Sequence, residues 1–422
     1  MKVCIIGAGD VGSFLAQKLA KEDMLIGVID TSSVKLESLS LKTNILTLNC
    51  DVSHEDCINN CKDYDFYLVL TDNDELNLAV ALFIRENWKK KNVVARIFKP
   101  IYNLLCEKLN LQYINVVEST VSNLNALLEY PFAGGVWQIG DIIIWNIKLQ
   151  QSNPLTGKLL KDFSPLREKF NFSVVLIRRN GEFLIPKGST RLLEGDEIYL
   201  ATDREHSREF LETLGIKFER VKTVFVLGYS RYADFWFKTL EDKNITVKFF
   251  HPLEDVCQEV GSKYPFIEVY QAFPTDGETL KAEGLLEADY IWCLDETDEK
   301  NIVTAMFVKN LSAKRVGVLL KHPQYENFIS SSGIDAYVLP KKVTASKIYS
   351  LLKGEDILEV IELAEEVDIF EKTFEGGHLP LRELKLEENE FVLFLKRNTE
   401  ILIPKGDTLI EDGDRLLILR KI

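Results

Sequence analysis

Three glycines near the start of the chain have the spacing of a nucleotide-binding turn. Gly7, Gly9 and Gly12 follow a short apolar run, and Asp30 ends the next apolar run, eighteen residues after the last glycine. In such a turn the first glycine lets the chain leave the strand sharply, the second leaves room for a pyrophosphate, and the third lets the helix pack closely on the sheet. Unpaired N–H groups at the start of that helix attract phosphate. We therefore predict a nucleotide site at Gly7, Ala8, Gly9, Asp10, Val11 and Gly12.

The acidic residue at the end of the second run narrows the choice of ligand. A carboxylate at Asp30 would accept hydrogen bonds from both ribose hydroxyls and would repel a 2′-phosphate. The expected ligand is therefore NAD(H) or an adenine nucleotide such as ATP or ADP, rather than NADP. Glycines with this spacing also occur in ordinary turns, but the flanking strand and helix patterns and the terminal acid favour a nucleotide site.

Polar residues at the ends of later strands are predicted to complete the same site. Asp51 and Val52 follow the third apolar run, and Thr71 follows the fourth. Because the carboxyl ends of parallel strands meet at one edge of a sheet, Asp51 and Val52 should flank the adenine. Thr71 should cap the next helix and line the phosphate side, with helix capping alone as the alternative for residues 71–74. Arg96, on the otherwise apolar fifth run, needs an anion and is expected to partner the phosphate.

The sequence lacks the groups that a dehydrogenase needs. Hydride transfer requires a general acid or base beside the nicotinamide, and none of the five histidines lies at this predicted sheet edge. Tyr337 and Lys341 have the spacing of a catalytic Tyr-x-x-x-Lys pair, but Pro340 forbids the helix that the pair requires. Tyr349 and Lys353 repeat the spacing, and we interpret them as an exposed helix face. No catalytic residue is predicted, and an NAD-dependent oxidoreductase is the alternative function.

Composition and charge are those of an ordinary globular protein. The 422 residues, 46% hydrophobic and 27% charged, are enough for two to four domains. No apolar run approaches the roughly eighteen residues that span a bilayer, and no leader precedes the first strand, so a cytoplasmic protein is expected. A net charge of −14, from 51 basic and 65 acidic residues, offers no basic surface to nucleic acid.

The cysteines are expected to be free thiols. There are seven, an odd number, and their scattered positions suit a reducing compartment better than a disulfide framework. Cys57 and Cys61 are one helical turn apart with His54 nearby, which makes a metal site conceivable. Because the tight pairing of zinc motifs is missing, buried or half-buried thiols are the favoured interpretation, and no metal site is predicted.

After the glycine turn, short apolar runs alternate with helical patterns, which predicts a doubly wound parallel α/β sheet. One helix, residues 74–88, should place Leu76, Val80 and Phe83 on one face. Beyond Gly134 the runs become short, β-rich and separated by turn signals, as in a small α+β module. The predicted strands are 45–48, 66–70, 93–97, 139–149, 172–177, 183–185 and 197–201, and the last helix of the sheet unit is 119–130.

This order of elements occurs twice. The sequence IPKG at 185–188 recurs at 403–406, 218 residues later, and the first strand with its turn glycine, residues 3–7, is answered at 224–228. Such matches at nearly one period indicate internal duplication of a two-domain unit. The predicted fold is two Rossmann-like sheets, each followed by a small α+β module, with domains at 1–136, 137–218, 219–352 and 353–422.

The second copy keeps the order of elements and loses the glycines. Tyr229 and Ser230 take the second and third places of its turn and Ala233 takes the last, so a side chain would block the pyrophosphate. Its second strand ends at His251 instead of an acid, and we interpret this histidine as a surface or hinge residue. The second copy should therefore be a structural or regulatory unit, with binding of a different small ligand as the alternative. The candidates for contact between the copies are Leu124, Leu127 and Leu128, although core packing is the favoured explanation for each of them taken singly.

Together, the N-terminal glycine turn, TDNDELN at 71–77, the arginine on the fifth strand and the duplicated IPKG modules resemble one family. Nearly the whole chain is similar to the TrkA-type regulatory subunits of bacterial Trk potassium uptake systems, which consist of two RCK (regulator of potassium conductance) units. In the second copy Leu319 aligns with the arginine. By this resemblance the nucleotide positions are Gly7 to Val11, Asp30, Asp51, Thr71, Asp72 and Arg96.

The resemblance also implies a biological setting. Members of this family are peripheral cytoplasmic proteins at the inner face of the cell membrane, and they bind NAD(H) and adenine nucleotides. They form a ring, here expected to be a homotetramer, under an integral-membrane potassium translocator, and they gate transport without chemical turnover. Regulation of a different cation transporter or antiporter is the alternative.

Overall fold

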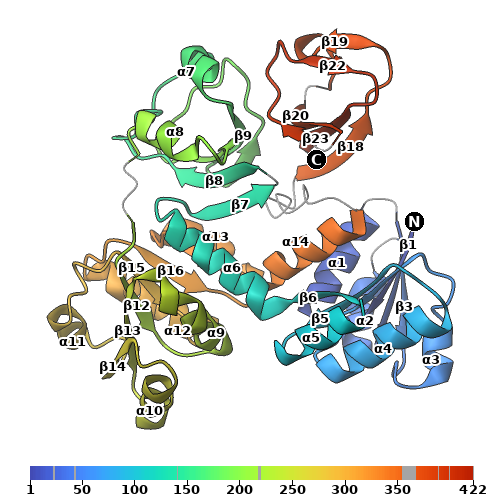
Figure 1. The fold of residues 1–422 in the computed structure, drawn as a ribbon, viewed down its shortest axis with the longest axis horizontal. Helices are drawn as coiled ribbons and strands as arrows, with labels where there is room; N and C mark the ends of the chain where they lie inside the picture. Colours follow the sequence, from blue (N-terminus) through green and yellow to red (C-terminus); the bar gives the residue numbers. More distant parts are fainter. Residues whose placement is uncertain are drawn as a thin grey trace.

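The structure is a computed structural model that describes residues 1–21, 24–41, 44–139, 141–216, 220–353, 367–387, 389–398 and 400–421. Two sheets flanked by helices form what we call the first lobe and the second lobe, and a small β-rich module follows each of them in the chain (Figure 1). The predicted fold class, two Rossmann-like sheets with two smaller modules, is thereby confirmed.

The sheet of the first lobe contains β1 (Lys2–Ile6), β2 (Leu25–Asp30), β3 (Ile45–Asn49), β4 (Phe66–Val69), β5 (Val93–Ile97) and β6 (Gln112–Asn115). These strands are parallel and lie in the order β3-β2-β1-β4-β5-β6. The order reverses between β1 and β4, which is where ligands bind in open α/β sheets. The helices are α1 (Asp10–Ala20), α2 (Ser33–Ser40), α3 (Glu55–Asn59), α4 (Asp74–Asn87) and α5 (Ile101–Lys108).

The second lobe repeats this topology with β12 (Thr223–Leu227), β13 (Thr246–His251), β14 (Ile267–Gln271), β15 (Tyr290–Cys293), β16 (Val316–Leu319) and β17 (Ala336–Val338). Its strand order, β14-β13-β12-β15-β16-β17, corresponds strand for strand to that of the first lobe. The predicted duplication therefore extends to the sheet topology. Its helices are α9 (Arg231–Leu240), α10 (Glu254–Lys263), α11 (Gly277–Ala282), α12 (Asp298–Asn310) and α13 (Glu326–Ser332).

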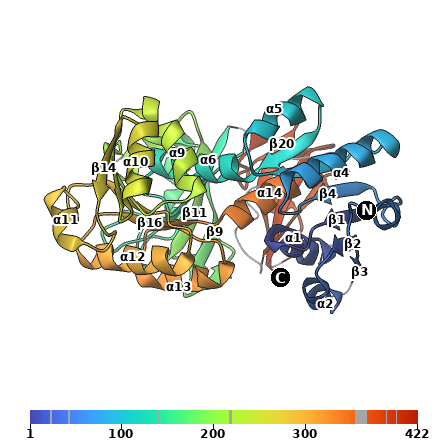
Figure 2. The same cartoon turned by 90° about the horizontal axis from the view of Figure 1, so that it is seen from below.

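Each lobe gives its last helix to the other lobe. Helix α6 (Val116–Glu129) leaves the first sheet and packs on α9, and helix α14 (Pro340–Lys353) leaves the second sheet and packs on α1. Both helices lie between the two lobes (Figure 2). Leu124 and Leu127 are fully buried in a cluster that includes Trp236, whose ring nitrogen donates to Asn125 Oδ1 at 3.1 Å. The predicted leucines of α6, including Leu128, thus belong to a core that joins the lobes.

The first small module is a sheet in the order β10-β9-β11-β8-β7, made of β7 (Gly135–Ile139), β8 (Ile142–Lys148), β9 (Phe172–Arg179), β10 (Glu182–Leu184) and β11 (Glu197–Asp203), with α7 (Ser164–Lys169) and α8 (Ser207–Thr213). The second module contains β18 (Val367–Thr373), β19 (His378–Pro380), β20 (Glu390–Arg397), β21 (Glu400–Leu402), β22 (Leu409–Glu411) and β23 (Arg415–Lys421). Its larger sheet has the order β18-β23-β20-β21.

One ion pair recurs in both modules. Arg179 binds Asp196 through two hydrogen bonds of 2.7 and 2.8 Å, and Arg397 binds Asp414 through two of 2.9 and 2.7 Å. Each aspartate is buried, and each arginine also donates to a backbone carbonyl, that of Arg191 for Arg179 and that of Leu409 for Arg397. Bidentate pairing fixes both side chains in one plane. The same ion pair thus holds the last residue of the LEGD turn, 193–196, in the first module and of the EDGD turn, 411–414, in the second.

Several element boundaries differ from the predicted ones. The predicted strand 139–149 corresponds to β8, and β7, which pairs with it as a hairpin, was not predicted. Helix α6 starts at Val116, three residues earlier than expected, because Asn115 caps it by accepting from Glu118 N at 3.0 Å. The buried face of α4 is formed by Asn77, Leu78, Val80, Ala81 and Ile84, whereas Leu76 and Phe83 are only partly buried.

The two Tyr-x-x-x-Lys spacings resolve differently. Tyr337 lies in β17 and Lys341 in α14, which begins at Pro340, so the proline separates the pair as predicted. Tyr349 lies within α14, but the prediction of an exposed face is wrong, because Tyr349 is only 2% exposed. It packs in the core between α14 and α1, with Lys18 Nζ 5.0 Å from its ring.

The prediction that all cysteines are free is wrong for one pair. Cys50 and Cys57 form a disulfide, with their Cα atoms 5.9 Å apart. The end of β3 and the start of α3 bring them together at a sequence separation of seven. No short cysteine motif has this spacing, so the sequence did not predict the disulfide. The other five are free and buried. Among the described residues no group of three or more His, Cys, Asp or Glu side chains is arranged to hold a metal ion.

Within the described ranges, no helix has both the length and the apolar character needed to cross a membrane.

Candidate functional site

The glycine turn between β1 and α1 has the geometry that its residues predict. Gly7 has φ +108°, a conformation that a side chain would strain, and a Cβ there would lie 2.8 Å from the backbone of Leu70. A Cβ on Gly12 would clash with the Gly7 carbonyl oxygen, only 1.9 Å away. A Cβ on Gly9 would meet no atom within 4 Å. Two glycines are therefore required by packing, whereas the third faces open space at the start of α1.

The start of α1 has N–H groups without a side-chain cap. Gly9 is the N-cap residue and offers no side-chain hydrogen bond. In the second lobe the corresponding residue, Ser230, caps α9 by accepting from Ala233 N at 3.5 Å. The first N–H groups of an uncapped helix are free to bind an anion. The first lobe thus leaves the start of its helix without a side-chain cap, whereas a serine caps the corresponding helix of the second lobe.

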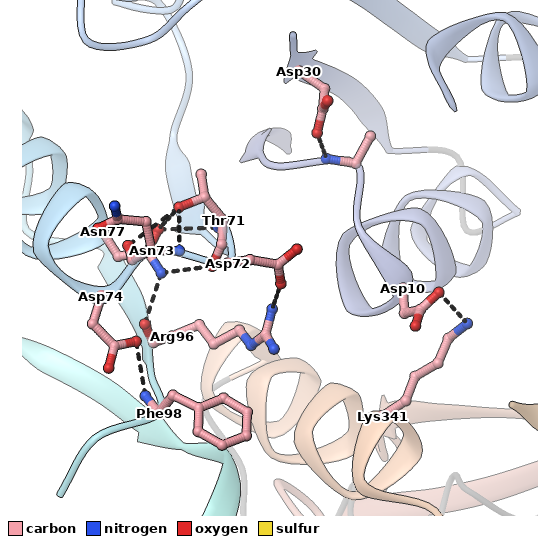
Figure 3. A network of polar contacts seen from close by, with 11 residues as sticks. Asp10, Asp30, Thr71, Asp72, Asn73, Asp74, Asn77, Arg96, Phe98 and Lys341 are labelled. Atoms are coloured by element: carbon pink, nitrogen blue, oxygen red, sulfur yellow. Dashed lines mark hydrogen bonds and ion pairs between the residues drawn. The ribbon is translucent and has the colours of Figure 1, made fainter. Parts of the chain in front are cut away.

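Asp30 stands at the end of β2 and directly faces the turn. Its Oδ2 accepts from Ala8 N at 2.6 Å (Figure 3). Its Oδ1 accepts from Ser32 N at 2.8 Å. These hydrogen bonds hold the half-buried carboxylate beside the glycines. Each carboxylate oxygen retains a further acceptor site, so the group can accept from a ribose hydroxyl without leaving the turn.

Asp51 and Val52, which we predicted to flank the adenine, lie just after the end of β3. Asp51 is exposed, and hydrogen bonds from the backbone and side chain of Ser53 hold the pKa of its carboxyl below the ordinary value. Val52 is buried in the same cluster as Ile6 and Ile29, which lie at the ends of β1 and β2. The Cys50–Cys57 disulfide closes the segment that carries both residues. The structure therefore places Asp51 and Val52 on the glycine-turn side of the sheet.

Thr71 has a different role from the predicted cap. Asn73 caps α4, accepting from Leu76 N at 2.9 Å. Thr71 instead donates through its hydroxyl and its backbone N–H to Oδ1 of Asn77, at 2.6 and 3.0 Å. Its hydroxyl is therefore committed to a structural contact. The prediction of Thr71 as a helix cap is wrong.

Asn77 joins the ends of two strands and was missed by sequence reasoning. This fully buried side chain donates to the carbonyls of Thr71 and Arg96, both at 2.9 Å. Asn301 repeats the arrangement in the second lobe, donating to Asp295 and Leu319 at 3.0 Å each. The available signal was the match of residues 74–77 with 298–301, which reflects this tie.

Asp74 is a second duplicated structural residue. Its carboxylate accepts from Phe98 N and Lys99 N at 2.9 and 2.7 Å, and Asp298 accepts from Lys321 N and His322 N at 2.7 and 2.9 Å. Asp74 thus holds the loop after β5 in the first lobe, and Asp298 holds the loop after β16 in the second. The similarity of the TDNDELN motif between the copies is explained by packing and carries no argument for a ligand.

Arg96 and Asp72 are brought together at the open edge of the sheet. Arg96 Nη1 donates to Asp72 Oδ1 at 2.8 Å, and the arginine side chain is 15% exposed while the aspartate is 80% exposed. The Nε of Arg96 is buried and has no hydrogen-bond partner among the described residues. Asp72 therefore supplies one carboxylate partner for Arg96, and the Nε of the guanidinium can still donate to a further acceptor.

Residues of the second lobe border this site. Lys341 Nζ lies 3.8 Å from Asp10 Oδ1 (Figure 3), and the guanidinium of Arg231 lies 4.4 Å from the centre of the Phe98 ring. Burial raises the pKa of Tyr232 to about 12, while the positive charges of Arg96 and Arg231 oppose this shift. The sequence could not reveal these neighbours, because they depend on how the two lobes exchange helices.

The corresponding place in the second lobe is occupied by its own side chains. Tyr229 packs its ring against Phe249 and His251, and its hydroxyl lies 3.0 Å from Asp234 Oδ1. His251 is buried, which lowers its pKa, and its Nδ1 accepts from Leu253 N at 3.2 Å. The interpretation of His251 as a surface residue is therefore wrong.

Solved structures place this fold among tandem RCK domains. The GsuK RCK domain has a TM-score of 0.62 at 18% identity, covering 100% of this chain and 92% of that one. The GsuK channel bound to NAD has a TM-score of 0.63 at 18% identity, covering 100% of this chain and 76% of that one. The class is thus a protein with paired RCK-type Rossmann lobes.

Family models and relatives identify the particular family. The TrkA-N domain matches residues 3–118 and 224–340, and the TrkA-C domain matches 147–215. The chain is 26% identical to the Trk system potassium uptake protein TrkA of Vibrio alginolyticus over 439 residues, and 28% identical to that of Haemophilus influenzae over 437. Both alignments cover 99% of this chain and 95% of the relative. The chain belongs to the TrkA family.

Proposed function

We propose that this protein is a regulatory subunit of a potassium uptake transporter and that it binds NAD(H), or alternatively ATP or ADP, in its first lobe without turnover. Relatives named for potassium uptake support the transport role. Two neighbours of similar fold are titled as bound to NAD and to ADP, which supports nucleotides as the ligand class.

The observation that carries the proposal is the contrast between the two glycine turns. The first lobe combines open space at Gly9, an uncapped start of α1 and the carboxylate of Asp30 at the turn. The second lobe, with the same topology, has side chains in all of these places. The site residues that we propose are Gly7, Ala8, Gly9, Asp10, Val11, Gly12, Asp30, Asp51, Val52, Thr71, Asp72 and Arg96.

The ligand should act by favouring one arrangement of the lobes. A nucleotide can shift an equilibrium only by its difference in affinity for two conformations. Because α6 and α14 each pack on the opposite lobe, closure of the first lobe around a nucleotide would be felt by the second. Nucleotides of different charge should close the site to different extents and so gate the transporter differently. The proposed domains, 1–136, 137–218, 219–352 and 353–422, are the units that move.

Self-association and membrane docking complete the proposal. Helix α5 exposes an apolar stripe of Ile101, Leu104 and Leu105, which are 73%, 63% and 42% exposed and lie on one helix face. Exposed apolar stripes mark interaction sites, and we propose this one for contact between copies in a homotetrameric ring. The ring would sit at the inner face of the cell membrane, below an integral-membrane potassium translocator.

A calorimetric titration of the full chain with NADH, NAD, ATP and ADP tests the proposal. Asp30→Ala should weaken binding by about ten- to a hundred-fold, because a hydrogen bond to a charged group contributes about 1.5–3 kcal/mol. Glu37→Ala, which removes an exposed carboxylate from α2, is the matched control and should bind as the wild type does. Unchanged affinity in Asp30→Ala would reject the ribose contact. Hydride transfer to any small substrate would favour an oxidoreductase instead.

A further inference from the structure

We infer that Lys341, on the helix that the second lobe gives to the first, binds the phosphates of the nucleotide and selects ligands that carry a diphosphate. This inference rests on the proposed nucleotide function. It adds to the site a residue from the other half of the chain.

The position of Lys341 is fixed by packing. Helix α14 lies along α1, and Ala345, Ile348 and Tyr349 share one buried cluster with Leu15 of α1. Lys341 is in the first turn of α14, so this packing directs it to the start of α1. Its side chain is only 17% exposed, although Lys carries a charge. The packing of α14 therefore brings the ammonium to the start of α1, beside the glycine turn.

The acidic partner that the structure gives Lys341 is a weak one. Asp10 Oδ1 lies 3.8 Å from the ammonium, at the limit of an ion pair, and the Asp10 side chain is 64% exposed. Pairs between groups this exposed contribute little stability. The contact with Asp10 alone therefore does not account for placing a mostly buried lysine side chain at this point.

The local electrostatics favour a further anion. The starts of α1 and α14 are both positive ends of helix dipoles, and the ammonium of Lys341 adds a full positive charge beside them. A cation at the start of a helix is unfavourable unless an anion compensates it. A diphosphate on the N–H groups of α1 would supply that compensation, and the open space at Gly9 leaves room for it.

This geometry predicts that Lys341 distinguishes ligands by their phosphate groups rather than by their base. When a diphosphate binds, Lys341 should turn from Asp10 to the phosphate oxygens. A nucleoside without phosphate should gain nothing from Lys341. Because α14 belongs to the second lobe, the same contact would tie that lobe to the occupied turn, so that diphosphate binding is reported directly across the lobes.

The test compares ADP, NADH and adenosine on the full chain. Lys341→Met keeps the aliphatic stem and removes the charge, and Lys347→Met, on the same helix, is the matched control. We expect Lys341→Met to bind ADP and NADH about ten-fold more weakly, as for loss of one charge-assisted hydrogen bond, with adenosine unaffected. The salt dependence of ADP binding should also become shallower. The control should match the wild type.

The outcomes separate this inference from the function on which it rests. If the wild type binds nucleotides and Lys341→Met binds ADP equally well, Lys341 is not a phosphate ligand and the inference is overturned. An equal loss for ADP and adenosine assigns Lys341 a purely structural role and also overturns it. If the wild type binds none of these nucleotides, the proposed function fails and takes the inference with it. Asp10→Asn should strengthen ADP binding about two-fold by removing the competing carboxylate, and weaker binding would contradict the competition.

Discussion

In the first lobe the turn after β1 exposes backbone at Gly9, whereas in the second lobe the corresponding turn after β12 carries the side chains of Tyr229 and Ser230. Gly9 faces open space, but Ser230 caps its helix, and Tyr229 packs over Phe249 and His251. Elsewhere the lobes agree, since Asn77 and Asn301 each join the ends of the two corresponding strands in their own lobe. The comparison separates what the fold requires, which both lobes retain, from what a ligand requires, which only one lobe retains.

The largest expected effect tests the part that both lobes share. Asn77→Ala and Asn301→Ala should each destabilise their own lobe by about 3 kcal/mol, because each leaves buried backbone groups without partners. Hydrogen exchange measured on peptides of each lobe would locate the loss. A large effect in one lobe and none in the other would show that the duplicated motif is not simply structural.

A smaller effect is expected where the turns differ in packing. Gly12→Ala should cost about 2 kcal/mol, because its Cβ would be forced against the Gly7 carbonyl. The reciprocal change, Ala233→Gly, should cost only about 1 kcal/mol, the difference in helix propensity. Thermal unfolding of both variants measures the asymmetry. Equal costs would mean that the two turns have the same backbone geometry.

The next prediction gives the first lobe a residue of the second. Gly9→Ser should leave stability nearly unchanged, because the site is open and serine is a good N-cap. It should weaken NADH binding about ten-fold, or about 1.4 kcal/mol, by placing a side chain where the pyrophosphate approaches. Calorimetry and thermal unfolding on the same sample distinguish the two effects. Undiminished NADH binding would remove Gly9 from the site.

The smallest effect concerns two exposed carboxylates at equivalent positions. Hydrogen bonds from Tyr102 and Lys99 lower the pKa of Glu75 to about 2, and one from Tyr325 lowers the pKa of Glu299. Because these folded-state pKa values lie below the ordinary 4.5, the stability that each carboxylate contributes is present above about pH 4.5. For Glu75 it is lost as the pH falls toward 2. The stability difference between wild type and Glu75→Gln should therefore shrink over that window, and a constant difference would contradict the assignment.

Local patterns predicted the first lobe well, because each signal was local. The glycine turn, the β-strand runs and Asp30 lie within thirty residues and depend on backbone geometry that short sequences determine. The offset of 218 between IPKG segments predicted the duplication, and the Arg179–Asp196 and Arg397–Asp414 ion pairs recur at the same offset. Placement of the site residues at one sheet edge follows from parallel topology alone.

What sequence reasoning missed depends on contacts between distant segments. The Cys50–Cys57 disulfide, the burial of Tyr349 and the approach of Lys341 to Asp10 arise from tertiary packing. Thr71 was misassigned because a hydroxyl near a helix start resembles a cap, whereas Asn77, one turn inside the helix, attracts it. His251 was misassigned because histidine is often exposed, and only the ring of Tyr229 beside it reveals its burial.

The exchange of α6 and α14 affects how a lobe with an open turn and a lobe with a closed turn are kept paired. If the halves were separate chains, the same exchange would be a domain-swapped dimer, formed only above some concentration and free to pair two degenerate halves. Covalent linkage makes the pairing intramolecular, at an effective concentration that dilution does not change. Every half with a closed turn is thereby partnered with a half that has an open one. Fusion fixes the stoichiometry of sensing at one proposed nucleotide site per pair of lobes.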